Sequence, residues 1–173
     1  MGREQEFSEF VTAALPRLLR LAYMLTGNGP NAEDLVQTAL ARSWNAWRLR
    51  RIDDLPSFVR RVMINSYASW YTRSRGKELA LDAIPEVPNT VDETGQVDER
   101  DALRRALLAL PSRQRAVIVL RYYEDLSELE IAGIMGTTPG TVKSQASRAL
   151  KRLGTEFAAT ERADWSTNGA ASE

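Results

Sequence analysis

The residues best suited to chemistry with a polyanion lie between positions 139 and 153, which contain two lysines, two arginines and no acidic residue. At helical spacing, one face of this stretch carries short polar and cationic side chains and the opposite face is apolar. Such a helix can bury one side and place the other in the major groove of DNA. We predict that five residues contact duplex DNA: Lys143, Ser144, Ser147, Arg148 and Lys151.

The flanking residues predict a helix-turn-helix that holds this face. Ser127 and Glu130 have the S-x-x-E spacing of a capping box, which places a helix start just inside Ser127. Gly136 can adopt the positive φ that ends this helix, and Thr138 followed by Pro139 suits the start of the next one. The alternative is an ordinary amphipathic surface helix. The apolar face that should be buried consists of Val142, Ala146, Ala149, Leu150 and Leu153.

A second group of residues, within positions 56–76, combines aromatic rings with arginines. This combination suits single-stranded nucleic acid, because unpaired bases stack on rings and phosphates pair with guanidinium groups. The alternative is that Tyr67 and Trp70 are core residues and that the arginines form a solvated face. The group consists of Arg60, Arg61, Tyr67, Trp70, Tyr71, Arg73 and Arg75.

The composition argues against several classes of chemistry. The 173 residues are 43% hydrophobic, enough for one domain or two small ones. The chain has no cysteine and no histidine, which excludes thiol chemistry and the side chain most used for acid–base catalysis. We expect no catalytic residue, no metal and no cofactor. No apolar run is long enough to span a bilayer and the N-terminus is charged, so we expect a cytoplasmic protein without membrane contact.

The charge is segregated along the chain, although the formal net charge is zero. Residues 1–76 carry 11 basic and 7 acidic side chains, whereas residues 77–100 carry 2 basic and 7 acidic ones. The segment 77–97 contains two prolines and lacks helical periodicity, which predicts a flexible acidic linker. We therefore divide the chain into a domain at 1–76, the linker, a domain at 98–154 and a disordered tail at 155–173. The alternative for the start of this tail is a short helical extension through Phe157.

Hydrophobic periodicity predicts helices and no convincing strand, and therefore an all-α fold of two small helical domains. In the first domain we expect helices over 5–25, from a cap at Asn31 to residue 48, and from about Asp54 through Trp70. In the second, helices over 98–110 and 112–123 precede the helix-turn-helix.

Two long segments resemble a known family. AEDLVQTALARSW (32–44), followed by LPSFVRRVMINSYASWYTRSR (55–75), resembles the second conserved domain of bacterial RNA polymerase sigma factors. LPSRQRAVIVLRYYEDLSELEIAGIMGTTPGTVKSQASRALKRL (110–153) resembles their fourth domain. Members with only these two domains form the extracytoplasmic-function group. The resemblance implies a promoter-specificity subunit that binds core RNA polymerase, melts promoter DNA and starts transcription, and that is not an enzyme by itself.

The resemblance also implies which residues contact the polymerase. In the family, the helix matching 31–48 docks on the clamp helices of the largest polymerase subunit, and the flap is a further expected contact. An alternative for Leu35 is burial in the domain core. The candidates for the core-enzyme contact are Asp34, Leu35, Gln37 and Trp44.

The DNA contacts implied by the resemblance divide between two promoter elements. In the family, the segment matching 60–75 binds the melted −10 element and captures an extruded base, and Asn65 matches a position at that pocket. The −35 element is read as duplex by 143–151, where Arg148 is expected on a base edge and Lys143 and Lys151 on phosphates. An anti-sigma protein is a candidate partner. The −10 candidates are Arg61, Asn65, Trp70, Tyr71, Arg73, Arg75 and Lys77.

Two other classes of protein remain as alternatives. A helix-turn-helix regulator independent of core polymerase would bind two operator half-sites and carry a dimerisation or sensor domain, whereas the first domain here is basic. A small nucleic-acid enzyme would need paired carboxylates such as Asp53 and Asp54, but adjacent residues at a helix start point in different directions.

Overall fold

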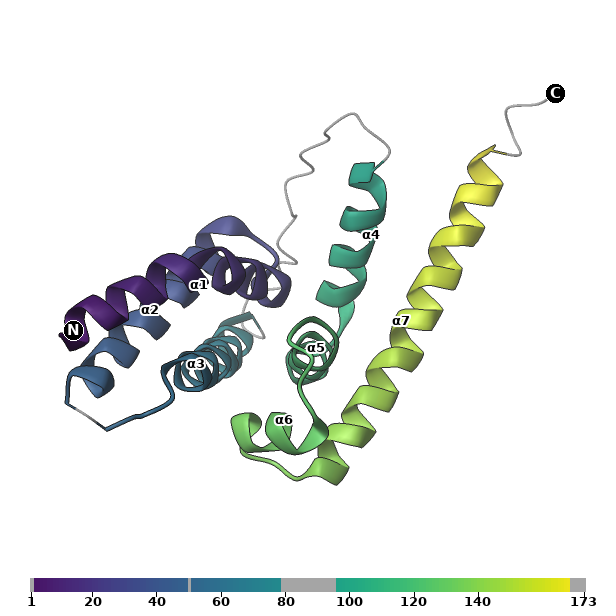
Figure 1. The fold of residues 1–173 in the computed structure, drawn as a ribbon. Coiled ribbons are helices and arrows are strands. Elements are labelled where there is room, and N and C mark those ends of the chain that lie inside the picture. Colours follow the sequence, from purple (N-terminus) through teal and green to yellow (C-terminus); the bar gives the residue numbers. More distant parts are fainter. Residues whose placement is uncertain (1, 50, 79–95, 169–173) are drawn as a thin grey trace.

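The computed structural model describes the backbone of residues 2–49, 51–78 and 96–168, and the side chains of residues 2–49, 51–70 and 100–155. Within these ranges the chain forms helices and no strand, which confirms the predicted all-α class (Figure 1). The elements are α1 (Arg3–Thr26), α2 (Gly29–Arg48), α3 (Leu55–Glu78), α4 (Gln96–Ala109), α5 (Ser112–Ile118), the π-helix η1 (Val119–Tyr123), α6 (Glu128–Met135) and α7 (Pro139–Asn168).

A tight turn joins α1 to α2. Gly27 ends α1 with φ +81°, and its N–H donates to the carbonyl of Tyr23. The side chain of Asn28 then caps α2 by accepting from the backbone N–H of Asn31 at 2.8 Å. The predicted cap at Asn31 is therefore wrong. The helix begins earlier because Gly29 and Pro30 fit its first turn, where the missing N–H of proline needs no partner.

α3 begins at Leu55, close to the predicted start at about Asp54, and Asp54 caps it. Its carboxylate accepts from the backbone N–H of Ser57 at 3.1 Å. Hydrogen bonds from the side chain and backbone of Ser57 favour the charged form and lower the pKa of Asp54 below its ordinary value. The helix continues to Glu78, so the first residues of the predicted linker are helical. Residues 79–95, which make up most of that linker, lie outside the described residues.

The helix predicted over 112–123 consists of two parts. α5 ends at Ile118 and the chain continues as the π-helix η1, in which the N–H of Glu124 donates to the carbonyl of Val119. Asp125 has φ +55°, a left-handed conformation that aspartate tolerates better than most residues, and it turns the chain toward α6. Glu124 is consequently held at the end of the widened turn, where its side chain is buried.

The helix-turn-helix is formed by α6 and α7. Ser127 Oγ accepts from the N–H of Glu130, while the N–H of Ser127 donates to the Glu130 carboxylate at 2.8 Å, which confirms the capping box. The pKa of Glu130 is lowered mainly by the hydrogen bond from the backbone N–H of Ser127 and also by the one from its hydroxyl. Gly136 ends α6 with φ +62°, and Thr138 caps α7 by accepting from the N–H of Thr141 at 3.2 Å.

Two expectations for α7 need correction. Leu150 was expected on the buried face but is 46% exposed, because it lies at the edge of that face, whose other members are buried. The helix also continues to Asn168, beyond the short extension through Phe157 that the sequence allowed, so the prediction of a disordered tail is wrong for residues 158–168. This segment has no glycine or proline and contains alanine, glutamate and arginine, which favour helix. The buried members of the face are Val142, Ala146, Ala149 and Leu153.

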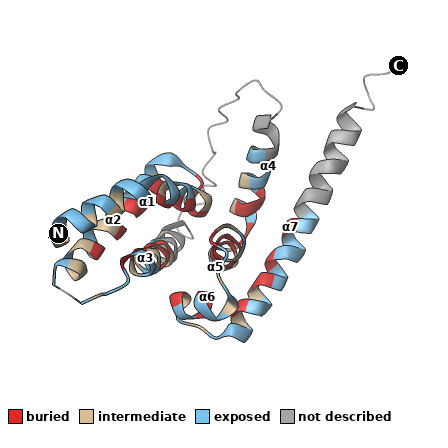
Figure 2. Ribbon diagram, viewed as in Figure 1, coloured by how far each residue is buried: buried red, intermediate tan, exposed pale blue. Residues whose placement is uncertain are grey.

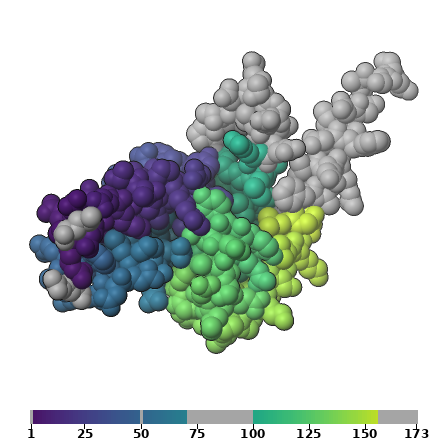
Figure 3. Space-filling model, viewed as in Figure 1, coloured from purple at the N-terminus to yellow at the C-terminus, as the bar shows by residue number. Residues whose placement is uncertain are grey.

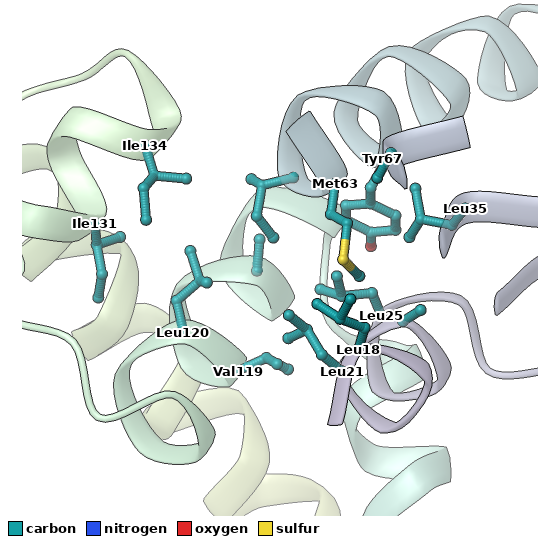
Figure 4. Packing of buried hydrophobic residues seen from close by; sticks show 14 of the residues in the cluster. Leu18, Leu21, Leu25, Leu35, Met63, Tyr67, Val119, Leu120, Ile131 and Ile134 are labelled. Carbon is teal, nitrogen blue, oxygen red and sulfur yellow. The ribbon is translucent and has the colours of Figure 1, made fainter. Parts of the chain in front are cut away.

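The two halves of the chain share one hydrophobic core. Buried residues face each other across the halves, with Leu21, Leu25 and Met63 on one side and Leu120 and Ile131 on the other (Figure 4). Figure 2 shows buried residues, coloured red, on each of the helices α1, α3, α5 and α6. In space-filling view the part from α5 to α6 lies directly against the first half (Figure 3). A smaller core cluster joins α4, α5 and α7.

The capping box makes a measurable contribution to stability. Replacing Ser127 with alanine is expected to lower the free energy of unfolding by about 1 kcal/mol, because α6 loses the acceptor for one of its unpaired N–H groups. Urea unfolding followed by circular dichroism measures this. The control is Thr12→Ala in the exposed middle of α1, where the hydroxyl only back-bonds to the Ser8 carbonyl. Equal losses in the two variants would contradict a specific role for the cap.

Candidate nucleic-acid interface

The predicted duplex-binding residues form one exposed face of α7. Val142 and Ala149 are buried, which orients the helix so that its polar side chains lie on the exposed side. Exposed stretches of α7 are pale blue in Figure 2. Ser144 and Ser147 place short groups between the cations, which leaves room for a close approach of a groove wall. All five predicted residues are exposed: Lys143, Ser144, Ser147, Arg148 and Lys151.

The predicted strand-binding residues lie along α3. Arg61 and Asn65 are exposed, and Trp70 is 42% exposed. Tyr67 is buried at 1% exposure and belongs to the core, which agrees with the alternative stated for it. The side chains of Tyr71, Arg73, Arg75 and Lys77 lie outside the described residues.

The structure does not bring all the strand-binding candidates together. Asn65 lies on the side of α3 that faces α5 and α6, where it lines a small cleft with Arg113 and Met135. Trp70 lies on the side that faces α2. A residue pair five positions apart in a helix cannot share one face, and in this chain the two faces lie against different neighbours.

Trp70 and part of the predicted polymerase contact instead share a groove between α2 and α3. The groove has a volume of about 290 Å³. Its wall is polar on the α2 side, and Arg42 crosses it to donate to the Ser66 hydroxyl at 3.2 Å. The lining includes Asp34, Thr38 and Arg42 from α2, and Ser66, Tyr67 and Trp70 from α3.

The four predicted polymerase contacts divide into two kinds. Asp34 and Gln37 are exposed on α2. Leu35 is 8% exposed and belongs to the core, as the alternative for it held. Trp44 is half-buried, and its ring packs on Phe7 with centroids 5.1 Å apart. Asp34 and Gln37 are therefore the candidates whose side chains are free to meet a partner on this face.

Asp53 and Asp54, the paired carboxylates of the enzyme alternative, belong to no metal-binding cluster among the described residues. Asp54 serves as a helix cap with a lowered pKa, which is the opposite of what a general acid needs. No cluster of three acidic or other metal-binding side chains occurs within the described parts of the chain. Among the same residues, no helix is long and apolar enough to cross a membrane.

Sequence reasoning missed the residues that join the two halves. Glu124 binds Arg17 and Arg60 of the first half at 3.0 and 2.8 Å. Arg115 is 4% exposed and donates to the carbonyl of Leu25 at 2.6 Å. The one sequence signal is that Arg115 directly precedes the apolar run 116–120.

Comparison with known proteins identifies the family of both halves of the chain. The model of Sigma-70 region 2 matches residues 10–77, and that of Sigma-70, region 4 matches residues 100–153. The RNA polymerase sigma-E factor of Streptomyces coelicolor is 39% identical over 164 residues, covering 93% of this chain and 91% of that protein. The ECF RNA polymerase sigma factor SigM of Mycobacterium tuberculosis is 30% identical, covering 88% of this chain and 77% of that protein.

A solved structure has the same fold. The sigma factor RpoE of Bartonella quintana, in complex with the anti-sigma factor NepR, superposes with a TM-score of 0.72 at 30% identity, covering 88% of this chain and 97% of that one. The fold and its two matched regions are those of a sigma factor that carries regions 2 and 4. The chain belongs to the extracytoplasmic-function RNA polymerase sigma factors. It binds core RNA polymerase and directs promoter recognition and transcription initiation.

Proposed function

We propose that this sigma factor divides its work between three faces. The exposed face of α7 binds the −35 element as duplex, with Arg148 on a base edge and Lys143 and Lys151 on phosphates. The α3 segment binds the melted −10 strand through Asn65 and its neighbours. Asp34 and Gln37 on α2 contact the polymerase clamp helices.

The observation that carries this proposal is the acid-free exposed face of α7. Its cations lie on one side of a helix whose opposite side is buried, and no acidic residue occurs between positions 139 and 155 to neutralise them. A groove-binding helix needs this asymmetry, because DNA phosphates repel carboxylates. Residues 60–75 supply a second cationic segment at the other half of the chain.

A transcription assay tests the proposed function as a whole. Purified protein is mixed with core RNA polymerase and a library of promoter fragments, and transcripts are mapped. Initiation at defined sites that depends on the protein supports the proposal. Binding to DNA without any association with core polymerase would favour the operator-binding alternative. The proposal also places the protein in the cytoplasm and gives it no catalytic step of its own.

The role proposed for α3 predicts a difference between duplex and pre-melted templates. Asn65→Ala and Trp70→Ala should reduce transcription from duplex promoter more than from a template with a pre-opened −10 bubble, because capture of an extruded base offsets a few kcal/mol of lost stacking and pairing. Both side chains are exposed, so the fold should be retained. Equal loss on the two templates would instead indicate a packing defect.

An anti-sigma protein is the second partner that we propose. The Bartonella quintana sigma factor, which covers most of this chain in superposition, was solved with its anti-sigma factor NepR. A partner of this kind would compete with core polymerase for the same faces. Co-purification from the native host, followed by competition against core polymerase, tests this directly.

A further inference from the structure

The groove between α2 and α3 has an acidic end and a basic end. Asp34 and Arg42 line it from the same helix, and their spacing in the sequence corresponds to about 12 Å along the helix axis. Both residues are exposed, and neither forms an ion pair within the described parts of the chain. The groove therefore presents a carboxylate and a guanidinium, well separated, to a ligand.

The guanidinium of Arg42 is held in place by the opposite helix. Its Nη1 donates to Ser66 Oγ at 3.2 Å, and Ser66 itself is buried. A guanidinium carries five N–H donors in a planar fork, so this hydrogen bond leaves other donors for a ligand. Because Arg42 is already positioned, less side-chain entropy is lost when it binds an anion.

An aromatic ring and an apolar floor lie between the two charges. The chain turns back between α2 and α3, so Trp70, one helical turn after Ser66, lies toward the Asp34 end of the groove. Leu35 and Tyr67 form the floor, and they lie next to each other in Figure 4. The indole of Trp70 is 42% exposed, so it offers a face on which a planar ring can stack.

The size of the groove selects a small ligand. Its volume of about 290 Å³ is at the lower end of the range for small-molecule sites. The cleft beside Asn65, by contrast, has a volume of about 30 Å³, which is room for a few water molecules only. A single nucleotide suits the groove in length as well, because its phosphate and the exocyclic amine of its base lie at opposite ends of the molecule.

We propose that this groove binds one nucleotide whose base carries an exocyclic amine. The phosphate accepts from the remaining donors of Arg42, the base stacks on Trp70, and the amine donates to the carboxylate of Asp34. Adenine, cytosine and guanine have such an amine, whereas thymine does not. The nucleotide comes either from the melted promoter strand or from the pool of free nucleotides. The strand source rests on the function proposed for α3, and the free source does not.

Calorimetric titration of the full chain with adenosine monophosphate tests the site without promoter DNA. We expect saturable binding with a Kd between about 10 μM and 1 mM. Adenosine lacks the phosphate, and inosine monophosphate has a carbonyl oxygen in place of the amine. Each of these two ligands should bind about tenfold or more weakly than adenosine monophosphate, because each loses a hydrogen bond to a charged group.

Variants of the groove assign each part of the ligand to its residue. Arg42→Gln should weaken binding of adenosine monophosphate about tenfold and leave adenosine unaffected, because only the phosphate contacts this residue. Asp34→Asn should abolish the preference for adenosine monophosphate over inosine monophosphate, since an amide can also donate to the carbonyl oxygen. The matched control is Arg48→Gln, which removes an exposed cation from α2 outside the groove and should bind as the unaltered chain.

A labelled oligonucleotide distinguishes the two sources of the nucleotide. The probe is the non-template strand of a promoter mapped with the holoenzyme. Binding of this strand by the Arg42→Gln holoenzyme that is weaker by about fivefold or more assigns the groove to the melted strand. Binding of adenosine monophosphate together with an unchanged strand affinity in Arg42→Gln assigns it to a free nucleotide.

The nucleotide site and the function proposed for α3 fail in different ways. Absence of saturable binding of adenosine monophosphate, together with an unchanged strand affinity in Arg42→Gln, would overturn the site. Equal loss of nucleotide binding in Arg42→Gln and Arg48→Gln would also overturn it, because the effect would then be one of general charge. An unchanged strand affinity in Asn65→Ala would count against the function proposed for α3, while the titration still reports on the groove.

Discussion

Arg115→Ala is expected to lower the free energy of unfolding by about 3–5 kcal/mol, a large part of the roughly 5–15 kcal/mol available to a domain of this size. The buried guanidinium donates to four carbonyls: Leu25 at 2.6 Å, Leu107 and Leu108 at 2.8 Å, and Leu110 at 3.1 Å. These carbonyls lie at the C-terminal ends of α1 and α4, where intrahelical donors run out and the helix dipoles favour a cation.

Urea unfolding with circular dichroism measures the effect. Arg113→Ala, two residues earlier on the same helix and exposed, is the control and should change the free energy of unfolding by no more than about 0.5 kcal/mol. Arg115→Lys should recover only part of the loss. The guanidinium reaches four carbonyls because its donors form a planar fork, and the single ammonium of lysine lacks that arrangement. A loss below 1 kcal/mol in Arg115→Ala would show that water satisfies these carbonyls equally well.

Arg148→Ala is expected to cost about 1–3 kcal/mol of discrimination between matched and scrambled −35 elements, which is about 5- to 150-fold in relative affinity. The expected contact is bidentate, from the guanidinium to a base edge. Lys151→Ala, three residues further on the same exposed face, should weaken binding to both sequences alike. It should also reduce the slope of log affinity against log salt concentration by about one.

Holoenzyme binding to the two duplexes, measured over a range of salt concentrations, separates these roles. Lys151→Ala is the natural control for Arg148→Ala, because both variants remove one exposed cation from the same helix. Equal effects on matched and scrambled duplexes in both variants would mean that Arg148 is a phosphate contact. Loss of discrimination in Lys151→Ala alone would exchange the two assignments.

Local sequence signals predicted local structure well. The capping box at Ser127, the left-handed Gly136 and the cap at Thr138 are all present. Each of them depends only on residues within four positions of itself. Errors occurred where two local solutions compete. Asn28 and Asn31 can each cap a helix, and only the geometry of the turn after Gly27 decides between them. The segment after Gly154 is rich in alanine, threonine, serine and glutamate, a composition that fits a polar tail as well as a helix, and α7 continues through it to Asn168.

The sequence by itself determined the helices, the exposed cationic face of α7 and the resemblance to sigma factors. These follow from spacing along a single helix and from motifs read in order. Only the tertiary structure decided how the halves meet, because the partners of Glu124 lie 107 and 64 positions away and no periodicity encodes such a pairing. It also decided that Asn65 and Trp70 face different neighbours, since the packing of α3 against α2 and region 4 determines what each face of that helix meets.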